Sequence, residues 1–473
     1  MGVVETMIGI VVCICLSGTV VIQKLVQQYA EDPNRQNEKD KDFAANMRFF
    51  RKWLFFIAAF FSGAYIIYNQ VAGTPWQAHL QEWLDLIFRW LHIIFGISWV
   101  GASFYFVFLE NSLNRTEEIR DELAGNLWAI HGGGFYFLEK YKIAPKQIPK
   151  HLHWFKYEAY FTWLTGTCLL TIVYYFNAES FLLNPEITQL SPVLGVMIGV
   201  SSIVFSWVFY ELLSQTSLLA PEKRPIFFLI MVLYLLAVAY CLSIVFNPRA
   251  AYIHMGAIMG TMMAGNVFFV IIPAQKEMVF AAKEGRAPNG ELGKRAGWRS
   301  YHNNYFTLPV LFIMISNHFP STFGNEHSVL ILLLISLAGA GIKHFHNQWE
   351  RGELNRWIVP ISLVLLVLTI YLTAPKSREE LANADKVPFT EVEAIIGQRC
   401  RPCHSKTPTD DVFIVAQGGM MFDTPEQIVA SKDKIMNRAV ITKTMPQGNK
   451  TKMTMEERTK IETWIMQGAK LED

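Results

Sequence analysis

Apolar and polar stretches alternate along the first 373 residues in a pattern typical of membrane-spanning helices. Most apolar runs reach the ~17–25 residues that a helix needs to cross ~30 Å of hydrocarbon. The run at 305–319 is shorter, so it could instead be partly re-entrant. We therefore expect an all-α membrane bundle of about ten spans. The runs occupy residues 3–27, 52–71, 83–109, 155–176, 190–210, 225–246, 251–272, 305–319, 327–345 and 356–373.

The loops between these runs carry basic residues on alternate sides. Lys and Arg are frequent at 28–52 and 111–154, whereas the loops at 72–82, 177–189 and 317–326 contain none. Because basic loops stay in the cytoplasm, this pattern places both termini outside. An even number of spans requires the same orientation. We expect a multi-pass protein of the bacterial inner membrane, embedded in the lipid bilayer.

Composition supports this class and narrows the partners. Apolar residues make up 52% of the 473-residue chain and charged residues 17%, whereas an average soluble chain has about 25% charged residues. The formal net charge of +2 does not point to nucleic acid. We therefore expect no nucleic-acid partner.

A polar C-terminal segment contains a motif of covalent haem attachment. Residues 374–390 form a charged, proline-bounded linker, and residues 391–473 follow as a separate domain. Cys400-Arg-Pro-Cys403-His404 has the C-x-x-C-H form in which two thiols bind haem and the histidine binds iron. A thioredoxin-like pair or half a zinc site would share C-x-x-C, but no βαβ pattern and no second cysteine pair accompanies it. We expect haem c in a small class I-like cytochrome c domain.

The second iron ligand should lie downstream on a loop. Met445 is followed by proline and, two residues later, by glycine, which stiffen a loop that presents sulfur to iron. We expect Met445 and His404 to be the two iron ligands. Thr454 and Glu457 form a capping box that begins a last helix, which should pack on the helix before the haem motif. Competing methionines are Met420, Met421 and Met453.

Polar side chains within the predicted spans form two layers, and the first lies toward the outside. Histidines in hydrocarbon are costly and are therefore functional candidates. His92, His254 and His318 come from three different helices, and Arg89 lies one turn before His92. Such histidines could hold a haem b, with Arg89 on a haem propionate. Alternatively, each histidine hydrogen-bonds a neighbouring helix, and Arg89 anchors its helix at the interface.

The second layer lies toward the cytoplasm. His131 precedes three glycines, which would let the backbone approach a ligand closely, although glycine runs usually mark flexible turns. A run of hydrogen-bonding side chains at 300–305 is longer than a helix cap requires. A flat polar heterocycle would fit these amides and rings. The expected catalytic residues are His131, Glu158, His302, Asn303, Asn304 and Tyr305.

Several segments match a known family in order along the chain. They are R-W-L-H at 89–92, G-I-S-W-V-G-A-S-F-Y-F at 96–106, H-G-G-G-F-Y at 131–136, W-F-K-Y-E-A-Y at 154–160 and H-N-N-Y at 302–305. Together they resemble the membrane-bound urate hydroxylases, bacterial urate oxidases fused to cytochrome c. The resemblance covers residues 83–473. Because that family usually has eight membrane helices, 83–373 would be the urate oxidase-like domain and 1–82 would add two helices.

The resemblance implies oxidation of urate to 5-hydroxyisourate with water as the oxygen source, and His131 or His302 as base. Electrons would pass to the chain's own cytochrome c domain and on to a terminal oxidase or a soluble cytochrome. A haem b in the outer half would divide a transfer across much of the ~30 Å core. Two other classes stay open: an electron-transfer subunit fed by quinol or another donor, and a purine-binding haem transporter or sensor without turnover.

Overall fold

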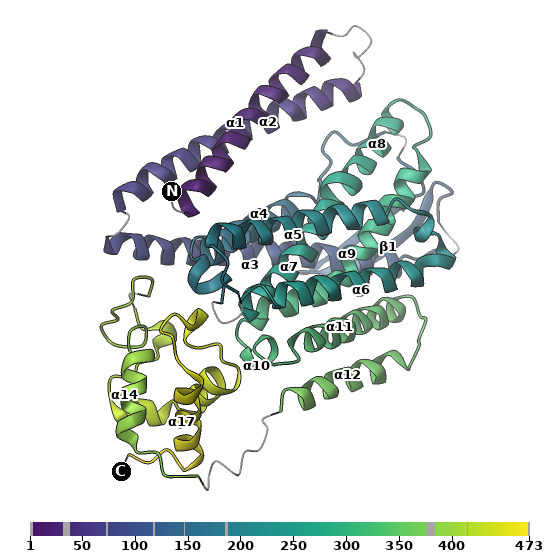
Figure 1. The fold of residues 1–473 in the computed structure, drawn as a ribbon. Coiled ribbons are helices and arrows are strands. Elements are labelled where there is room, and N and C mark those ends of the chain that lie inside the picture. Colours follow the sequence, from purple (N-terminus) through teal and green to yellow (C-terminus); the bar gives the residue numbers. More distant parts are fainter. Residues whose placement is uncertain are drawn as a thin grey trace.

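The computed structural model describes residues 3–31, 38–71, 74–116, 119–145, 147–184, 188–374, 384–413 and 415–471. The protein is mostly helical, and a long bundle of helices is followed by a small C-terminal helical domain (Figure 1). Helices occur at all ten predicted apolar runs. Among the described residues, five helices are long and apolar enough to cross a membrane. The count of ten spans therefore stays a prediction. These five are His79–Ser112, Pro192–Leu213, Arg224–Ser243, Pro248–Lys283 and Ser328–Glu350.

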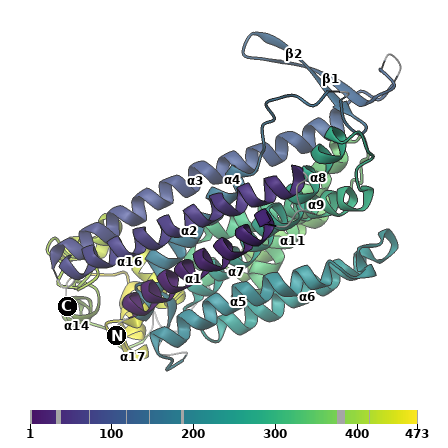
Figure 2. The ribbon, with the colours of Figure 1, turned by 90° about the horizontal axis from the view of Figure 1, so that it is seen from above.

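The chain begins with two long helices, α1 (Val3–Glu31) and α2 (Glu38–Val71), which pack against each other. At Gly18 a Cβ would lie 3.0 Å from the Leu54 side chain, so glycine lets the two helices approach closely. Helix α3 (Pro75–Ser112) follows and lies beside the bundle (Figure 2). Its proline falls in the first turn, where the missing N–H costs nothing.

Helix α7 (Pro248–Gly265) packs against α5 (Pro192–Leu213) and α9 (Gly290–Ser316) at the centre of the bundle. Most of its side chains are buried, and it continues through a π-helical segment, η5 (Asn266–Ile271), into α8 (Ile272–Lys283). At Gly265 a Cβ would collide with the Trp207 indole, and at Gly256 it would lie 2.7 Å from Ile313. Helices in hydrocarbon associate through such close packing, because lipid is as apolar as their side chains. The packing therefore fixes α7 against α5 and α9.

The remaining elements of the bundle connect in sequence order with short turns. Pro309 lies inside the long helix α9. The bounds are α4 (Tyr157–Leu169), η1 (Leu170–Tyr175), η2 (Ala178–Leu182), α5 (Pro192–Leu213), η3 (Ser217–Leu219), η4 (Pro221–Lys223), α6 (Arg224–Ser243), α7 (Pro248–Gly265), η5 (Asn266–Ile271), α8 (Ile272–Lys283), α9 (Gly290–Ser316), α10 (Pro320–Phe323), α11 (Ser328–Glu350) and α12 (Ile358–Leu372).

One antiparallel hairpin departs from the expected all-α fold. Strands β1 (Leu123–His131) and β2 (Gly134–Tyr141) pair along their length. Gly132 and Gly133 form a two-residue turn with φ of +57° and +82°, the left-handed backbone that such hairpins favour and that glycine adopts without strain. The glycine run therefore closes a hairpin, and the prediction of a purely helical protein is wrong in this segment.

The C-terminal domain is helical and has its own apolar core. Phe389 on the first helix and Trp464 on the last lie 5.6 Å apart between ring centroids, so these two helices pack together as predicted. The linker residues 375–383 lie outside the described residues. The elements are α14 (Phe389–Arg399), η6 (Gln417–Gly419), α15 (Pro425–Ala430), α16 (Lys432–Ile435), η7 (Met436–Ile441), η8 (Gln447–Asn449) and α17 (Met455–Met466).

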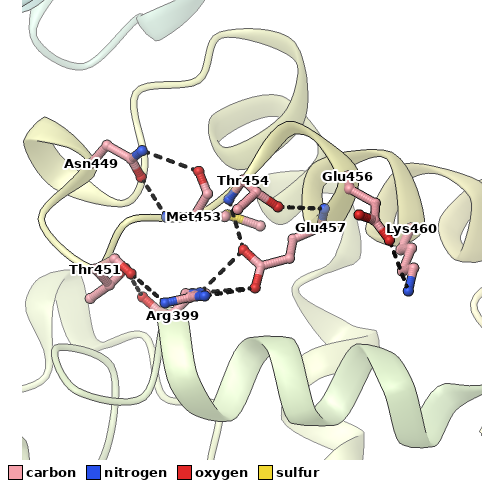
Figure 3. A network of polar contacts seen from close by, with 8 residues as sticks. All are labelled: Arg399, Asn449, Thr451, Met453, Thr454, Glu456, Glu457 and Lys460. Carbon is pink, nitrogen blue, oxygen red and sulfur yellow. Dashed lines mark hydrogen bonds and ion pairs between the residues drawn. The ribbon is translucent and has the colours of Figure 1, made fainter. Parts of the chain in front are cut away.

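A polar network joins the first and last helices of this domain (Figure 3). The Arg399 guanidinium donates from Nε and Nη2 to the Glu457 carboxylate at 3.0 and 2.9 Å, and from Nη1 to the Thr451 carbonyl at 2.6 Å. The predicted capping box between Thr454 and Glu457 is confirmed. The loop that follows Met445 is thereby tied to the helix that precedes the C-x-x-C-H motif.

The two ends of the bundle are different. Both views place the C-terminal domain at one end of the long helices and the β1–β2 hairpin at the other (Figures 1 and 2). Helix α10 lies at the C-terminal domain's end, and α11 runs from there toward the hairpin. A position along α9 or α11 therefore reports how far a residue is from the C-terminal domain.

Candidate functional site

The polar H-N-N-Y segment lies within α9, and its four side chains do not converge on one point. Successive residues of an α-helix point about 100° apart, because a turn takes about 3.6 residues. His302 and Asn303 face α5, α6 and the α7–η5 junction, whereas Asn304 and Tyr305 face α11. The structure therefore divides the predicted site into two polar clusters.

The first cluster is called here the Tyr210 network. Tyr210 Oη lies 2.8 Å from His302 Nδ1 and accepts a hydrogen bond of 2.9 Å from Asn266 Nδ2. That amide also donates to Asn303 Oδ1 at 2.8 Å, and Asn303 Nδ2 donates to the Met263 carbonyl at 3.0 Å. This network comprises Tyr210, Glu211, Asn266, Arg299, His302 and Asn303, and most of its polar atoms are bonded within the protein.

A fully buried guanidinium lies at the base of this network. Arg299 is 0% exposed and forms an ion pair with the Glu211 carboxylate. It also donates from Nη1 to Asn266 Oδ1 at 3.1 Å and lies 4.7 Å above the Tyr210 ring centre. A buried charge is tolerated only when it is paired and hydrogen-bonded. Glu211 therefore holds Arg299, and through it the position of the amides.

The second cluster, called here the Lys343 cluster, comprises Asn304, Tyr305, Lys343, His344 and Asn347. Asn304 Nδ2 donates to Asn347 Oδ1 at 3.3 Å, and the Tyr305 hydroxyl bonds to His344 Nδ1. Asn304, Lys343 and Asn347 are each buried. Within the described part of the chain, Asn304 Oδ1, Asn347 Nδ2 and Lys343 Nζ have no hydrogen-bond partner. Among the described side chains of the Tyr210 network, Arg299 Nε alone is unbonded in this way, so the Lys343 cluster has more buried polar atoms without a partner.

The structure separates two predicted catalytic residues from both clusters. His131 is exposed at the end of β1, and a Cβ at either following glycine would meet nothing within 4 Å. Glu158 begins α4, where one carboxylate oxygen lies 3.8 Å from His153 Nε2. Its other oxygen is buried without a hydrogen-bond partner among the described residues. In the part of the chain that the structure describes, neither side chain forms a hydrogen bond or ion pair with the polar face of α9.

The three outer histidines have different neighbours. His92 Nδ1 lies 3.0 Å from the Thr162 carbonyl and 3.1 Å from Thr165 Oγ1, both on α4. Because a carbonyl only accepts, Nδ1 carries the proton and Nε2 keeps a lone pair. That is the arrangement of a histidine that ligates a metal through Nε2. His92 therefore has the chemistry of a haem ligand.

The other outer residues fit a haem less well. His254 is fully buried, donates from Nδ1 to the Ala250 carbonyl at 2.8 Å, and has Nε2 3.1 Å from the Tyr175 hydroxyl. Both of its ring nitrogens are thus engaged. His318 is exposed just after α9. Arg89 pairs with Asp85 on its own helix at 2.6 Å.

The C-x-x-C-H motif lies at the end of α14. Burial raises the pKa of Cys400 and of Cys403 to about 12, whereas the nucleophile of a dithiol oxidoreductase needs a lowered pKa. Burial lowers the pKa of His404, whose Nδ1 lies 3.2 Å from the Met420 carbonyl. Nδ1 is therefore the donor, and Nε2 keeps a lone pair. These residues fit thioether attachment of a haem with histidine as an axial ligand.

The methionines of this domain differ in how accessible their sulfur atoms are to a haem iron. Met453 is 1% exposed within the apolar core, whereas Met445 is half-buried on the loop before η8. The Met445 backbone donates to the Arg438 carbonyl at 2.9 Å and accepts from Arg458 at 2.7 Å. In the described ranges, no group of three or more His, Cys, Asp or Glu side chains is placed to hold a metal ion. A haem iron needs only one such residue and a methionine.

The C-terminal domain contacts one end of the bundle through the loop that follows Met445. At Gly448, where φ is +57°, a Cβ would lie 2.6 Å from the Ser180 carbonyl on η2. Phe181 of η2 makes an edge contact with Phe413, at 5.7 Å between ring centroids. At Gly324 after α10, a Cβ would lie 2.6 Å from Thr442 Cβ. Small residues on both sides therefore permit close docking.

Apolar helices with buried polar clusters define a polytopic helical protein of membrane type. The chain belongs to the urate oxidase N-terminal family, whose model matches residues 78–374. The resemblance read from the sequence is thereby confirmed for the bundle, and the family points to oxidation of urate. No curated protein and no solved structure matches the chain.

Sequence reasoning missed several residues of the two clusters. Tyr210, Arg299 and Lys343 were not predicted. In the sequence, Tyr210 looks like an ordinary aromatic residue, Arg299 like a basic residue of a cytoplasmic segment and Lys343 like a charge at a helix end. A helical-wheel comparison of α9 with α11 would have identified Lys343. Lys343 and Asn347 are four residues apart and therefore share a face.

Removal of the Glu211 carboxylate is expected to destabilise the bundle. Glu211→Ala leaves Arg299 buried without its counter-charge, which costs about 3–5 kcal/mol. The measurement is the unfolding midpoint of the full chain in detergent under denaturant titration. Glu291→Ala is the matched control, because Glu291 pairs with Lys294 on the surface, where such pairs contribute about 0–1 kcal/mol. Equal midpoints for the two variants would contradict the structural role of Glu211.

Gly448→Ala is expected to weaken docking of the C-terminal domain, since its methyl group would overlap the Ser180 carbonyl. We expect a cost of about 1–3 kcal/mol, as for other overpacked contacts, seen as faster amide hydrogen exchange across η2. Gly418→Ala provides the control, because Gly418 has a similar φ of +62° with nothing within 4 Å. If both variants exchange alike, backbone strain rather than contact explains the effect.

Proposed function

We propose that this protein oxidises urate to 5-hydroxyisourate in its membrane bundle and passes the electrons to its own C-terminal cytochrome c domain. Urate and one water yield 5-hydroxyisourate, two protons and two electrons. The oxygen atom comes from water, so no dioxygen is needed at the site. A terminal oxidase or a soluble cytochrome then takes the electrons. The observation that carries the proposal is the family match over 78–374 in a chain that continues into a C-x-x-C-H domain.

The C-terminal domain is suited to the acceptor role by its residues. Haem c, when bound, supplies a centre that takes one electron at a time. Cys400 and Cys403 would attach it, and His404, held by the Met420 carbonyl, would be the first iron ligand. Met445 would be the second, because Met453 is enclosed in the apolar core. The Arg399–Glu457 network keeps the two ligand-bearing segments together.

Docking supports transfer within one chain. Gly448 lies three residues after Met445 and sits against Ser180 of η2. The ion pair of Lys450 with Asp410, at 2.9 Å, ties this turn to the loop that carries Phe413. The contacts of Gly448 and Phe413 with η2 are therefore made by two loops that are joined to each other beside the proposed ligand Met445. Such a fixed contact favours internal transfer over diffusion of a separate carrier.

His92 supports an intermediate centre in the bundle. It contacts α4 near the middle of α3, and Phe104, beside the Lys343 cluster, lies twelve residues further along α3. At a rise of 1.5 Å per residue this is about 18 Å along the axis. His92 would hold the iron of a haem b through Nε2, because its Nδ1 bonds to α4 while both nitrogens of His254 are engaged.

Urate is expected to reduce the haem of the purified full chain without oxygen. The measurement is the reduced c-type absorption band after anaerobic addition of urate to the oxidised protein. Because two electrons leave each urate, one urate should reduce two ferric haems. Quinol should produce no comparable reduction. A band that appears only with quinol would instead assign an electron-transfer subunit, and urate binding without reduction would assign a transporter or sensor.

Met445→Ala is the accompanying variant. Loss of the thioether should lower the haem potential and slow reduction by urate, while covalent haem c stays attached to the cysteines. Met455→Ala serves as the control, because Met455 is 58% exposed on α17. Unchanged reduction in Met445→Ala would remove Met445 as the ligand without affecting the urate assignment.

Pyridine haemochrome spectra are expected to contain both b-type and c-type signals. His92→Ala should abolish the b-type signal and leave the c-type signal at full strength. His327→Ala is the control, because His327 is a surface histidine before α11. Retention of the b-type signal in His92→Ala would show that His92 does not hold that haem.

A further inference from the structure

Lys343 is an unusual residue for the interior of an apolar helix. It is 3% exposed on α11, and its Nζ lies 3.8 Å from the centre of the Phe104 ring. A cation in hydrocarbon is costly unless it is paired, and a ring face offsets only part of that cost. The nearby Glu350 carboxylate accepts from Asn111 at 2.7 Å, and its other oxygen is 3.5 Å from His346. Among the described groups, none accepts a hydrogen bond from Lys343.

The amides beside Lys343 are also incompletely bonded. Asn347 lies one turn after Lys343 on α11 and pairs with Asn304 across to α9. Over the described residues, Asn304 Oδ1 and Asn347 Nδ2 have no hydrogen-bond partner, although both residues are 3% exposed. A native interior satisfies nearly all such atoms, so several unsatisfied atoms at one place mark a candidate binding site. The unbonded groups are the Lys343 ammonium, the Asn347 N–H donor and the Asn304 carbonyl acceptor.

We propose that the Lys343 cluster binds the substrate as a purine anion, an assignment that rests on the proposed function. Urate is a monoanion near neutral pH and presents N–H and C=O groups around a flat ring. Lys343 would neutralise its charge, Asn347 would donate to a carbonyl oxygen, and Asn304 would accept from a ring N–H. The Phe104 face lies beside the same site. Charge and hydrogen-bond pattern thus match one ligand.

The other members of the cluster can move a proton. Tyr305 Oη bonds to His344 Nδ1 and lies 2.9 Å from Tyr301 Oη. A proton released by urate or by the attacking water can pass to Tyr305 as its own proton moves to His344. Tyr305 and His344 are positioning and proton-transfer residues here, whereas Lys343, Asn304 and Asn347 bind the anion. His302, in the Tyr210 network, supports α9 from its other side.

The test is equilibrium binding of radiolabelled urate to the dithionite-reduced full chain, in which no oxidation can occur. Lys343→Met should weaken binding at least tenfold, because it keeps an unbranched side chain only one atom shorter and removes the charge. Lys343→Arg should retain most of the affinity. Lys294→Met is the matched control, because it removes a charge from an exposed residue at the start of α9. It should bind as the wild type does.

Each result decides between distinct conclusions. If wild-type protein binds no urate, the proposed function fails and this site fails with it. If wild type binds urate and Lys343→Met binds equally well, the site assignment is overturned while the function stands. Haem content and the oxidised spectrum confirm that each variant is folded. If Lys343→Met does not accumulate, Asn304→Ala and Asn347→Ala are judged by the same tenfold criterion.

Discussion

The bundle depends on one constraint: hydrocarbon offers no hydrogen bonds, so every buried polar atom must find its partner within the protein or in a ligand. The Tyr210 network meets most of this requirement internally, with Glu211 paired to Arg299 and the Asn266 amide bonded on both sides, and among its described side chains Arg299 Nε alone has no partner. The Lys343 cluster does not. Because both lie on α9, the Tyr210 network would hold the helix in place while the Lys343 cluster would face the proposed ligand. A rigid face and a receptive face on one helix are what a preorganised site requires.

The same helix explains why the H-N-N-Y segment is informative although its members do not meet. Four successive residues that point about 100° apart cannot all face one small molecule, but they can fix a helix against several neighbours at once. His302 and Asn303 bond toward α5 and η5, and Asn304 and Tyr305 bond toward α11. The motif therefore locates the helix that organises the site, and the unsatisfied atoms locate the ligand.

Much of the fold could be predicted from the sequence. Hydropathy located ten apolar runs, each of which contains a helix, and capping chemistry located the last helix, because both signals are local. The turn at Gly132 and Gly133 was considered beside the ligand approach, but the β1–β2 hairpin was missed because no strand was expected on either side of it. Lys343 was missed for a different reason. Lys343 is unusual because neither α9 nor α3 provides a hydrogen-bond acceptor for its Nζ. The lack of a partner on other helices cannot be recognised from the sequence of α11.

The position of the Lys343 cluster places a demand on electron transfer. It lies 15 to 19 residues along α11 from the end near the C-terminal domain, about 22–29 Å at a rise of 1.5 Å per residue. Substrate and proposed acceptor are therefore on opposite sides of the bundle. With the orientation that loop charge predicts, each electron moves outward, and an inside-negative potential favours this by about 2.3 kcal/mol per 100 mV. In the proposed arrangement this separation would let an internal purine reduce an external carrier, and an intermediate centre near His92 would divide the distance.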